Sequence, residues 1–359
     1  MKKILLFTDS LGAGGAQRQL AGLATFLYQK GYEVKVCTYH NLDFYKSFLD
    51  EVNVPNELIP NGGNCKKRIS AVCKYFRRES PDWVIAYQET PSFVACVAKL
   101  LGGKFRLAVS ERNTTQHLGW KEHLRFFFYH WADAIVPNSY SQEEFLASRY
   151  PWMKNRLTTI TNFVNLEHFN FVGREKSEMP EIAVVATIWP SKNTLGFIDA
   201  VNILAAKGCK FHVSWYGKSD SYVEYFRLCQ RKIDELGLHD YISLKDKTKQ
   251  IKRVYQKCDF FCLPSYYEGT PNVICEAMSC GRPVICSAVC DNSVYVAEKE
   301  NGFLFNPRDS YSIADSIERA LNVSDMEYFH LCEQSRAKAE RLLSENKFVN
   351  QYIKIIESE

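Results

Sequence analysis

The sequence predicts an α/β protein made of two doubly wound domains, and three observations support that prediction. Short apolar runs typical of buried strands alternate along the chain with stretches that have helical periodicity. This alternation occurs twice, once on each side of a polar segment at residues 170–180. A length of 359 residues also suits two domains better than one. Because strands that alternate with helices form parallel sheets covered on both faces, we expect two Rossmann-like domains that face a central cleft.

The first series of elements accounts for an N-terminal domain at residues 1–170. Its strand-like runs are "KILLFT", "EVKVCT", "WVIAY", "RLAVS" and "AIVPNS". Helical patterns lie between them, at residues 15–30, 66–78, 91–101 and 120–131. Ligands of such sheets bind at the carboxyl ends of the strands, so the loops that follow these runs are the candidate binding loops.

The second series accounts for a C-terminal domain at residues 181–340. Its strand-like runs are "EIAVVATI", "KFHVSWYG", "YISL", "DFFCLP" and "PVICSA", and its helical patterns lie at residues 194–207, 221–236 and 249–256. The polar segment between the two series contains the expected linker, residues 171–180. Residues 341–359 are expected to form a C-terminal helix that can pack back on the N-terminal domain.

Composition indicates an ordinary globular protein, with 46% apolar and 24% charged residues. The first residues, "MKKILLFTDS", contain an apolar run too short for a signal peptide, and no apolar stretch reaches about 18 residues. We therefore expect a cytoplasmic protein. The 13 cysteines include no C-x-x-C pair, which favours buried free thiols over a zinc site or disulfides.

Positive charge is concentrated in the N-terminal half of the chain. Residues 1–180 contain 23 Lys and Arg against 17 Asp and Glu, whereas the remainder contains 22 against 24. The densest run is "CKKRISAVCKYFRRES", where basic residues share a predicted helix with an apolar stripe. Two interpretations stay open: a helix that lies on an anionic membrane surface, or a solvated helix whose stripe packs in the core.

The stretch "SYYEGTPNVICEAMSCGRPVI", residues 265–285, places two glutamates around the start of a predicted helix. Thr270 is the expected N-cap and Pro271 the first helical residue, and the helix should end at Gly281. Glu268 then lies in the loop before the helix, while Glu276 lies between one and two turns inside it.

The start of this helix has the chemistry of a nucleotide-sugar site. Unpaired backbone N–H groups at a helix N-terminus bind anions such as a diphosphate. The expected donors are Gly269, Thr270, Asn272 and Val273. The carboxylates on either side can accept hydrogen bonds from hydroxyls. A nucleotide-sugar has phosphates in the middle and a hydroxylated ring at each end, so it satisfies both requirements.

A glycine-rich loop, "DSLGAGGAQRQLAGL", follows the first strand. Gly12, Gly14 and Gly15 do not complete the G-x-G-x-x-G dinucleotide fingerprint, because residue 17 is Gln. The second strand also lacks an acidic residue at its end, so a nicotinamide-dependent oxidoreductase is disfavoured. The loop is interpreted either as a site of anion binding or close approach, or as a simple turn.

Five segments, read together, resemble a known family. They are "GGAQRQ" at 14–19, "ITNFVNLEHF" at 160–169, "SKN" at 191–193, "CDFFCLPSYYEGTPNVICEAMSCGRPVI" at 258–285 and "NGFLF" at 301–305. This set resembles glycosyltransferase family 4, whose members are retaining enzymes of the GT-B fold. The resemblance spans nearly the whole chain, and the segment with two glutamates eight residues apart is its most specific part.

The resemblance implies a role for each matching residue. Glu276 would bind the ribose hydroxyls of the donor, and Glu268 would meet the hydroxyls of the transferred sugar. The turn at residues 269–271 would approach the sugar and the phosphates. Lys192 matches the diphosphate-binding lysine of the family, and the glycines at 14–15 match a loop that faces the donor from the other domain.

Three departures from the family pattern bear on the site. Members usually carry Gly-Arg five residues before the lysine, with the arginine on the diphosphate, whereas this chain has Ala186-Thr187. Many members have a histidine after an N-domain strand where this chain has Glu111, Arg112 and Asn113. We place these three residues and Arg18 on the acceptor or diphosphate side, with Arg18 or Arg112 as substitutes for the missing arginine. Residues 290–294 replace the usual Gly-Gly and glutamate, which leaves the role of that loop open.

We therefore expect a retaining hexosyltransferase that moves a sugar from a nucleoside-diphosphate-sugar to a glycan or lipid-linked glycan, in the assembly of surface polysaccharide, lipopolysaccharide or another glycoconjugate. The alternative is a catalytically weak nucleotide-sugar-binding relative that acts as a partner subunit. No Asp-x-Asp occurs, so no metal ion or other cofactor is expected, and Lys192 with the helix terminus would stabilise the departing diphosphate. In the front-face mechanism that the resemblance implies, a leaving-group oxygen takes the acceptor proton, so the two glutamates are not assigned as acid and base.

The basic N-terminal half favours an acceptor at a membrane surface, such as a lipid-diphosphate-linked sugar. The helix at 66–78 and the aromatic and basic run "WKEHLRFFFYHW", residues 120–131, both fit a reversible contact with anionic lipid. The aromatic side chains of the second run cannot all share one helix face, so several must lie in the core. We expect peripheral contact with the inner face of the membrane and no nucleic-acid partner.

Overall fold

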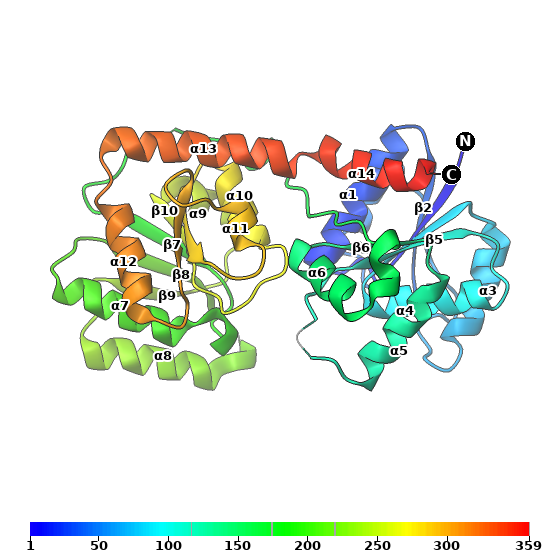
Figure 1. Ribbon diagram of the computed structural model, residues 1–359, viewed down its shortest axis with the longest axis horizontal. Coiled ribbons are helices and arrows are strands. Elements are labelled where there is room, and N and C mark those ends of the chain that lie inside the picture. The colour runs from blue at the N-terminus through cyan, green and yellow to red at the C-terminus, as the bar shows by residue number, and fades with distance from the viewer. Residues whose placement is uncertain (116, 174, 219, 359) are drawn as a thin grey trace. The chain divides into compact units, whose positions relative to one another are not determined.

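The computed structural model describes residues 1–115, 117–173, 175–218 and 220–358, and it divides into two compact units (Figure 1). The first unit contains Met1–Phe163 together with Glu345–Glu359, and the second contains Val164–Ser344. Each unit is built around a six-stranded parallel sheet. The predicted fold class, with two Rossmann-like domains, is confirmed.

The sheet of the first unit has the strand order β3-β2-β1-β4-β5-β6. Its strands are β1 (Lys3–Phe7), β2 (Glu33–Thr38), β3 (Asn56–Leu58), β4 (Trp83–Tyr87), β5 (Arg106–Glu111) and β6 (Ala134–Pro137). Its helices are α1 (Gly15–Gln29), α2 (Lys46–Glu51), α3 (Arg68–Glu79), α4 (Glu89–Leu100), α5 (Trp120–Phe128), α6 (Tyr140–Arg149) and α14 (Glu345–Glu357). The strand order reverses between β1 and β4, which is where such sheets form a crevice at their carboxyl ends.

The first sheet is apolar on both faces, as expected for a parallel sheet covered by helices. Along β1, Ile4 and Leu6 pack into one core cluster, whereas Leu5 and Phe7 pack into the cluster on the other face. The alternation explains why the strand reads as a continuous apolar run in the sequence.

The sheet of the second unit has the order β12-β11-β10-β7-β8-β9. Its strands are β7 (Glu181–Val185), β8 (His212–Lys218), β9 (Ile242–Asp246), β10 (Phe260–Leu263), β11 (Val284–Ser287) and β12 (Gly302–Phe305). Its helices are α7 (Thr194–Ala206), α8 (Val223–Leu236), α9 (Ile251–Lys257), α10 (Asn272–Ser279), α11 (Asn292–Tyr295), α12 (Ser310–Leu321) and α13 (Asp325–Leu343). Helices α7, α8 and α12 pack on one face of this sheet, and α9 and α10 pack on the other (Figure 1).

The described residues of the expected linker, 171–173 and 175–180, pack along the second unit. The ring of Phe171 lies against Gly281, where an added Cβ would come within 2.1 Å of it, and Arg282 Nη2 donates to Val172 O at 2.6 Å. Ser177 donates from its backbone and its hydroxyl to Asp259. Because these groups are satisfied inside the second unit, the boundary between the units falls at Phe163 and Val164, before the expected position at residue 170.

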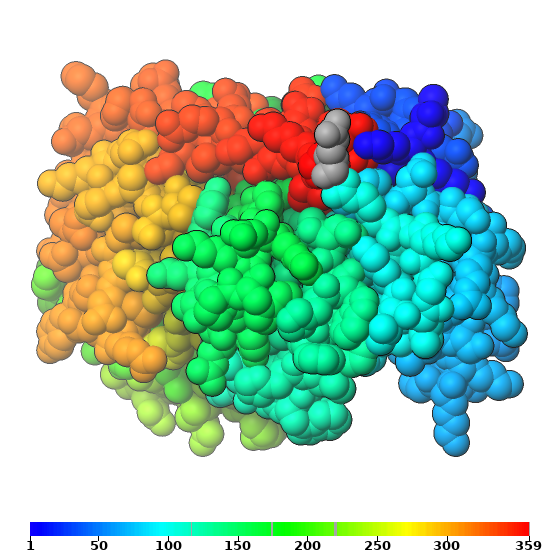
Figure 2. Space-filling model, turned by 45° about the vertical axis from the view of Figure 1, so that its right-hand side comes forward, coloured from blue at the N-terminus to red at the C-terminus, as the bar shows by residue number. Residues whose placement is uncertain are grey.

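Helix α14 packs on the first unit, beside the N-terminal strand (Figures 1 and 2). The hydroxyls of Tyr87 and Tyr352 lie 2.7 Å apart, and Trp83 Nε1 donates to Ile356 O at 3.1 Å. At the end of the helix, Lys2 pairs with Glu357 at 2.8 Å. The C-terminal helix expected at 341–359 thus divides between the last residues of α13 and a separate helix that starts at Glu345.

All 13 cysteines are free thiols, and most are buried, in agreement with their interpretation as small apolar side chains. Within the described residues, no helix of at least 18 residues is apolar enough to cross a bilayer.

Candidate active site

A pocket of about 510 Å³ opens at the carboxyl edge of the second sheet. Its walls come from the loops that follow β7, β9 and β10, from the end of β8, and from the first turns of α9 and α10. The lining residues include Thr187, Lys192, Gly217, Lys247, Thr248, Ile251, Glu268, Thr270, Pro271, Asn272 and Val273. The parallel arrangement of the strands explains why residues far apart in the sequence meet here.

Lys192 and Glu268 form an ion pair in this pocket, with 2.5 Å between Nζ and Oε1. Lys192 belongs to a short 3₁₀ turn between β7 and α7, and Glu268 lies in the loop between β10 and α10. Both side chains are partly exposed. A cation and a carboxylate are therefore held together in a solvent-accessible pocket, as a ligand with an anionic group next to hydroxyls requires.

The start of α10 differs from the prediction by one residue. Pro271, and not Thr270, occupies the N-cap position, and Cys275 N donates to Pro271 O at 3.1 Å. The N–H of Asn272 donates to Thr270 O at 2.9 Å. Because this tight turn uses the Asn272 N–H, Asn272 is removed from the expected set of anion-binding donors. Thr270 and Val273 remain in the pocket lining, and Gly269 lies in the same loop.

Glu276 lies in α10 and is only 5% exposed. It accepts a hydrogen bond of 3.0 Å from the hydroxyl of Tyr255, a fully buried residue of α9. Burial, with the charge of Glu276, raises the pKa of Tyr255 well above its ordinary value, so the hydroxyl stays a donor. Tyr255 was not among the predicted site residues. The sequence contains only an indirect signal for it: Tyr255 lies four residues after Ile251, so the two residues share one face of the predicted helix, and Ile251 lines the pocket.

Thr187, which stands where family members carry an arginine, shares the pocket with a second lysine. Thr187 lines it, and so does Lys247, a cation that the sequence analysis did not assign to the site. Gly217 lies so close to the end of β7 that an added Cβ would be 1.8 Å from Ala186 O. Since this contact is with backbone, a side chain at residue 217 would displace the loop that carries Thr187.

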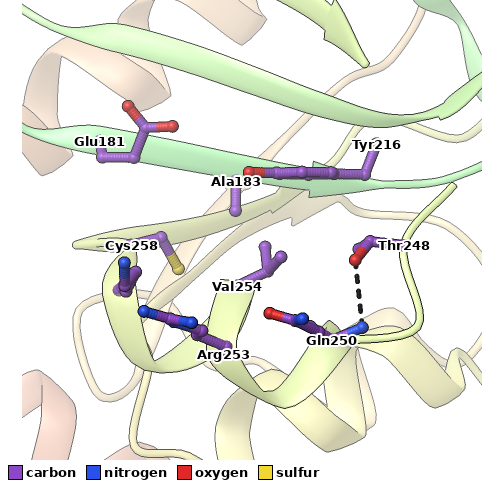
Figure 3. A pocket seen from close by; sticks show the side chains of 9 residues that line it. Glu181, Ala183, Tyr216, Thr248, Gln250, Arg253, Val254 and Cys258 are labelled. Carbon is purple, nitrogen blue, oxygen red and sulfur yellow. Dashed lines mark hydrogen bonds between the residues drawn. The ribbon is translucent and has the colours of Figure 1, made fainter. Parts of the chain in front are cut away.

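A second pocket of about 410 Å³ adjoins the first, between β7, β8 and α9. Figure 3 shows the Tyr216 ring lying along β7 with its hydroxyl toward Ala183, opposite Gln250, Arg253 and Val254 of the helix side. Tyr216 and Thr248 line both pockets. Thr248 Oγ1 accepts a hydrogen bond of 3.0 Å from Gln250 N, and this bond orders the loop between the two pockets.

The predicted glycine loop lies at the carboxyl end of β1 in the first unit. Gly14 is the N-cap residue of α1 with extended backbone, and Gly15 begins the helix. The carbonyl of Gly14 accepts the Arg18 N–H at 3.0 Å. Asp9 organises the loop, because its carboxylate accepts hydrogen bonds from Ser10 N and from Gln17 Nε2.

The three residues that replace the family histidine have different surroundings. Glu111 is fully buried, pairs with Arg125 at 3.3 Å and accepts a hydrogen bond from the Tyr129 hydroxyl. Burial raises the pKa of Glu111, and the charge of Arg125 opposes the rise. The expectation that Glu111 faces a ligand is not met within the first unit, because its carboxylate is enclosed by these partners.

Arg112 is also buried, with its guanidinium 4.9 Å from the centre of the Tyr87 ring and bonded to Asn162 Oδ1. Its Nε has no hydrogen-bond partner in the described part of the chain. Asn113 is exposed. Of the three, Asn113 is therefore the residue whose side chain the first unit presents to solvent. Within the described residues, no group of three or more His, Cys, Asp or Glu has an arrangement that could hold a metal ion.

Solved structures with the same architecture identify the class of fold. A glycosyltransferase from Rickettsia africae superimposes with a TM-score of 0.86 over 99% of this chain and 98% of that chain, at 14% identity. The Anabaena Alr3699/HepE protein, in complex with UDP and glucose, gives a TM-score of 0.83 over 100% of both chains, at 17% identity. The fold is that of the GT-B glycosyltransferases.

Family models match both halves of the chain. Residues 13–168 match the model described as Glycosyltransferase Family 4, and residues 179–323 match the model described as Glycosyl transferases group 1. The chain belongs to glycosyltransferase family 4. A relative from Campylobacter jejuni is 24% identical over 337 residues, which cover 90% of this chain and 89% of that protein. Its name is GalNAc-alpha-(1->4)-GalNAc-alpha-(1->3)-diNAcBac-PP-undecaprenol alpha-1,4-N-acetyl-D-galactosaminyltransferase.

Proposed function

We propose that the protein is a retaining glycosyltransferase that moves a hexose from a nucleoside-diphosphate-sugar to a lipid-linked or polysaccharide glycan during surface glycan assembly. The observation that carries the proposal is the Lys192–Glu268 pair, held 2.5 Å apart in a pocket that also contains the start of α10. The UDP and glucose bound by the Anabaena protein and the lipid-diphosphate glycan in the name of the Campylobacter relative support the choice of donor and acceptor.

The proposed chemistry needs stabilisation of charge more than acid and base catalysis. The bond between the anomeric carbon and the diphosphate oxygen breaks, and a bond to the acceptor oxygen forms on the same face of the sugar. The acceptor proton passes to an oxygen of the departing diphosphate. Lys192, with the first turn of α10, stabilises the growing negative charge, and Lys247 lines the same pocket and adds a second cation. No metal ion takes part in the proposal.

The two glutamates have separate roles in this scheme. Glu268, beside the lysine, meets hydroxyls of the transferred sugar. Glu276, deeper and fixed by Tyr255, accepts the ribose hydroxyls. A carboxylate that is 5% exposed and already oriented loses little entropy on binding a ligand, which suits the recognition of a group common to all donors of one type.

Stereochemistry tests the retaining assignment. With an α-linked donor, proton NMR of the first product formed should show an α-glycoside, and a β-glycoside would overturn the assignment. The Lys192→Ala protein is the matched control for background transfer. Nucleotide binding without transfer to any glycan and without donor hydrolysis would favour the alternative, a binding subunit without its own activity.

We further propose that the protein acts in the cytoplasm, in peripheral contact with anionic membrane through the first unit. In α5, Trp120, Leu124 and Phe127 are exposed at spacings of four and three residues, so they share one helix face. Phe126 is fully buried, as expected for part of that aromatic run. An exposed apolar stripe next to basic residues is typical of helices that lie at a membrane interface.

Helix α3 contributes less positive charge than its sequence suggests. Val72, Tyr75 and Phe76 pack in the core, and Arg78 is bonded to Glu57 and Glu79. Hydrogen bonding from Lys35, with help from Arg78 and against the effect of burial, lowers the pKa of Glu57 to about 2. The basic side chains of this region that stay exposed include Lys66, Lys67 and Lys74.

Vesicle sedimentation tests the membrane contact. The wild-type protein should bind vesicles with 30% anionic lipid and leave neutral vesicles unbound, and salt should reduce the binding. Trp120→Ala with Phe127→Ala should reduce it further, as should Lys66, Lys67 and Lys74 changed to Glu. A matched control is Phe329→Ala, an exposed ring on α13 of the other unit. Equal partitioning to both kinds of vesicle would overturn the proposal.

A further inference from the structure

Aromatic side chains gather on four loops at the carboxyl edge of the second sheet, and all of them except the partly buried Tyr222 are exposed. Trp189 follows β7, Tyr222 follows β8, Tyr266 and Tyr267 follow β10, and Tyr311 lies at the start of α12 after β12. Trp189, Tyr266 and Tyr267 are 39%, 36% and 43% exposed, and Tyr311 is 74% exposed. We call these five residues the aromatic rim. None of the five lines the donor pocket.

Contacts between neighbouring loops join the aromatic rim into one surface. The rings of Trp189 and Tyr222 have centroids 3.9 Å apart. Tyr266 N donates to Ser191 O at 2.9 Å, which ties the β10 loop to the loop after β7. Asn193 Nδ2 donates to Pro307 O at 2.7 Å, and the Arg308 guanidinium lies 5.6 Å from the centre of the Tyr266 ring. The rim therefore spans from β8 to β12 along the sheet edge.

The aromatic rim adjoins the reacting end of the proposed donor site. Tyr267 directly precedes Glu268, and Trp189 is three residues before Lys192. The nucleotide side of the pocket is lined from α9 and α10, which cover one face of the sheet. Tyr222 lies instead directly before α8, and Tyr311 lies in the first turn of α12; both helices pack on the other face of the sheet. The Lys192–Glu268 pair thus lies where the pocket meets the aromatic rim.

The chemistry of the aromatic rim selects a class of ligand. Single exposed apolar residues are ordinary, but a contiguous group marks a binding surface. Tyr and Trp present a flat apolar face together with a polar edge. A pyranose ring has the matching character, with a C–H face for stacking and hydroxyls at its edge. A phosphate-rich ligand would call for several available cations, whereas Arg308 already lies over the Tyr266 ring and Lys192 pairs with Glu268.

We propose that the aromatic rim binds the glycan part of the acceptor, namely the sugar units next to the one that receives the transferred hexose. The inference rests on the proposed transferase function and deepens it. It assigns acceptor recognition to the second unit as well as to the first, where the sequence placed it. It also explains why rings from several loops are kept exposed to water beside the donor pocket.

Substitution of single rings separates acceptor binding from donor binding. In Trp189→Ala and Tyr266→Ala proteins, the KM for an oligosaccharide acceptor should rise about 10-fold, while the donor KM and the Kd of the nucleoside diphosphate stay within twofold. The wild-type preference for a trisaccharide over a monosaccharide acceptor should disappear in these variants. A general loss of structure would not remove a preference between acceptors. Phe329→Ala is the control, because this ring is also exposed and belongs to the same unit but lies outside the rim.

Direct binding keeps this test independent of catalysis. Free oligosaccharides of two to four sugars, without lipid or diphosphate, should bind the wild-type protein on an array, and Trp189→Ala should lose the signal. If no array glycan binds while the nucleotide does, or if the donor KM alone rises in the variants, the aromatic rim is not an acceptor site. If neither nucleotide nor glycan binds, the proposed function itself has failed.

Discussion

The carboxyl edges of the two sheets have the same topology but use their charged residues differently. In the first unit, Glu111 pairs with Arg125 and is fully buried, and Asp9 is occupied by Gln17 and Ser10. In the second unit, Lys192 and Glu268 pair at the wall of an open pocket and stay partly exposed. The fold therefore supplies the position of a site, while the burial of its charged groups decides whether they can meet a ligand.

The largest effect is expected from removing the cation of the second edge. Lys192→Ala should lower kcat by about 10²- to 10³-fold, because charge grows on the leaving diphosphate in the transition state. The donor KM should change much less. Lys192→Arg keeps the charge and should retain more of the rate. Steady-state kinetics with a nucleoside-diphosphate-sugar measure both constants, and a loss confined to KM would contradict the assignment.

The buried glutamate of the same edge should affect binding. Glu276→Ala should weaken the nucleoside diphosphate by about 1.5–3 kcal/mol in calorimetry, because the ribose hydroxyls lose a charged acceptor. Tyr255→Phe, which removes only the hydroxyl that orients Glu276, is the matched control and should cost less. Glu268→Gln should instead leave nucleotide affinity nearly intact and lower turnover of the complete donor. Equal losses in both glutamate variants would show that their roles are not divided.

Adding a cation should sharpen the difference between the two edges. Thr187 lines the same pocket as Lys192, so Thr187→Arg places a guanidinium where a diphosphate is expected. A charge-assisted hydrogen bond should tighten nucleotide binding by about fivefold. Unchanged affinity in the variant would mean that Lys247 already fills the place of the missing arginine, and Lys247→Ala should then weaken binding.

The smallest effect should come from the first edge and should appear in stability. The pKa of Glu111 is raised in the folded protein above its ordinary value of 4.5. The stability that this group contributes is therefore fully present below pH 4.5 and is lost as the pH rises through the raised pKa. Glu111→Gln should remove that pH dependence from the free energy of urea unfolding, without changing nucleotide affinity. A parallel loss of nucleotide affinity would give Glu111 a role beyond the first unit.

Much of the second edge follows from local sequence rules, whereas the first edge does not. The apolar run before Pro264 and the turn before α10 place Glu268 and Glu276, since strands and helix starts depend on near neighbours in the chain. The predicted N-cap, Thr270, is wrong by one residue, because Pro271 occupies the N-cap position and the Asn272 N–H closes the turn before it. The entry of Lys247 into the pocket and the contact of Tyr255 with Glu276 depend on how α9 packs against its neighbours, which no local pattern contains.

The burial of Glu111 in the first unit also depends on tertiary contacts that local sequence patterns do not contain. An acid at the end of an apolar strand is expected at a ligand edge, and the sequence gives no sign that Arg125 and Tyr129 will enclose it. Both partners belong to the aromatic and basic run at residues 120–131, whose local pattern suggested a membrane-facing helix instead.

The ion pair between Lys2 and Glu357 brings the two ends of the described chain together on the first unit. The second unit is consequently an insertion: one continuous stretch, Val164–Ser344, enters and leaves a host whose own sequence is split. A circular permutant that joins the ends by a short linker and opens at an exposed loop should keep both sheets intact. The chain passes between the two units twice, at residues 163–164 and 344–345. A force applied to the chain ends would therefore act on the first unit before it reached the donor pocket.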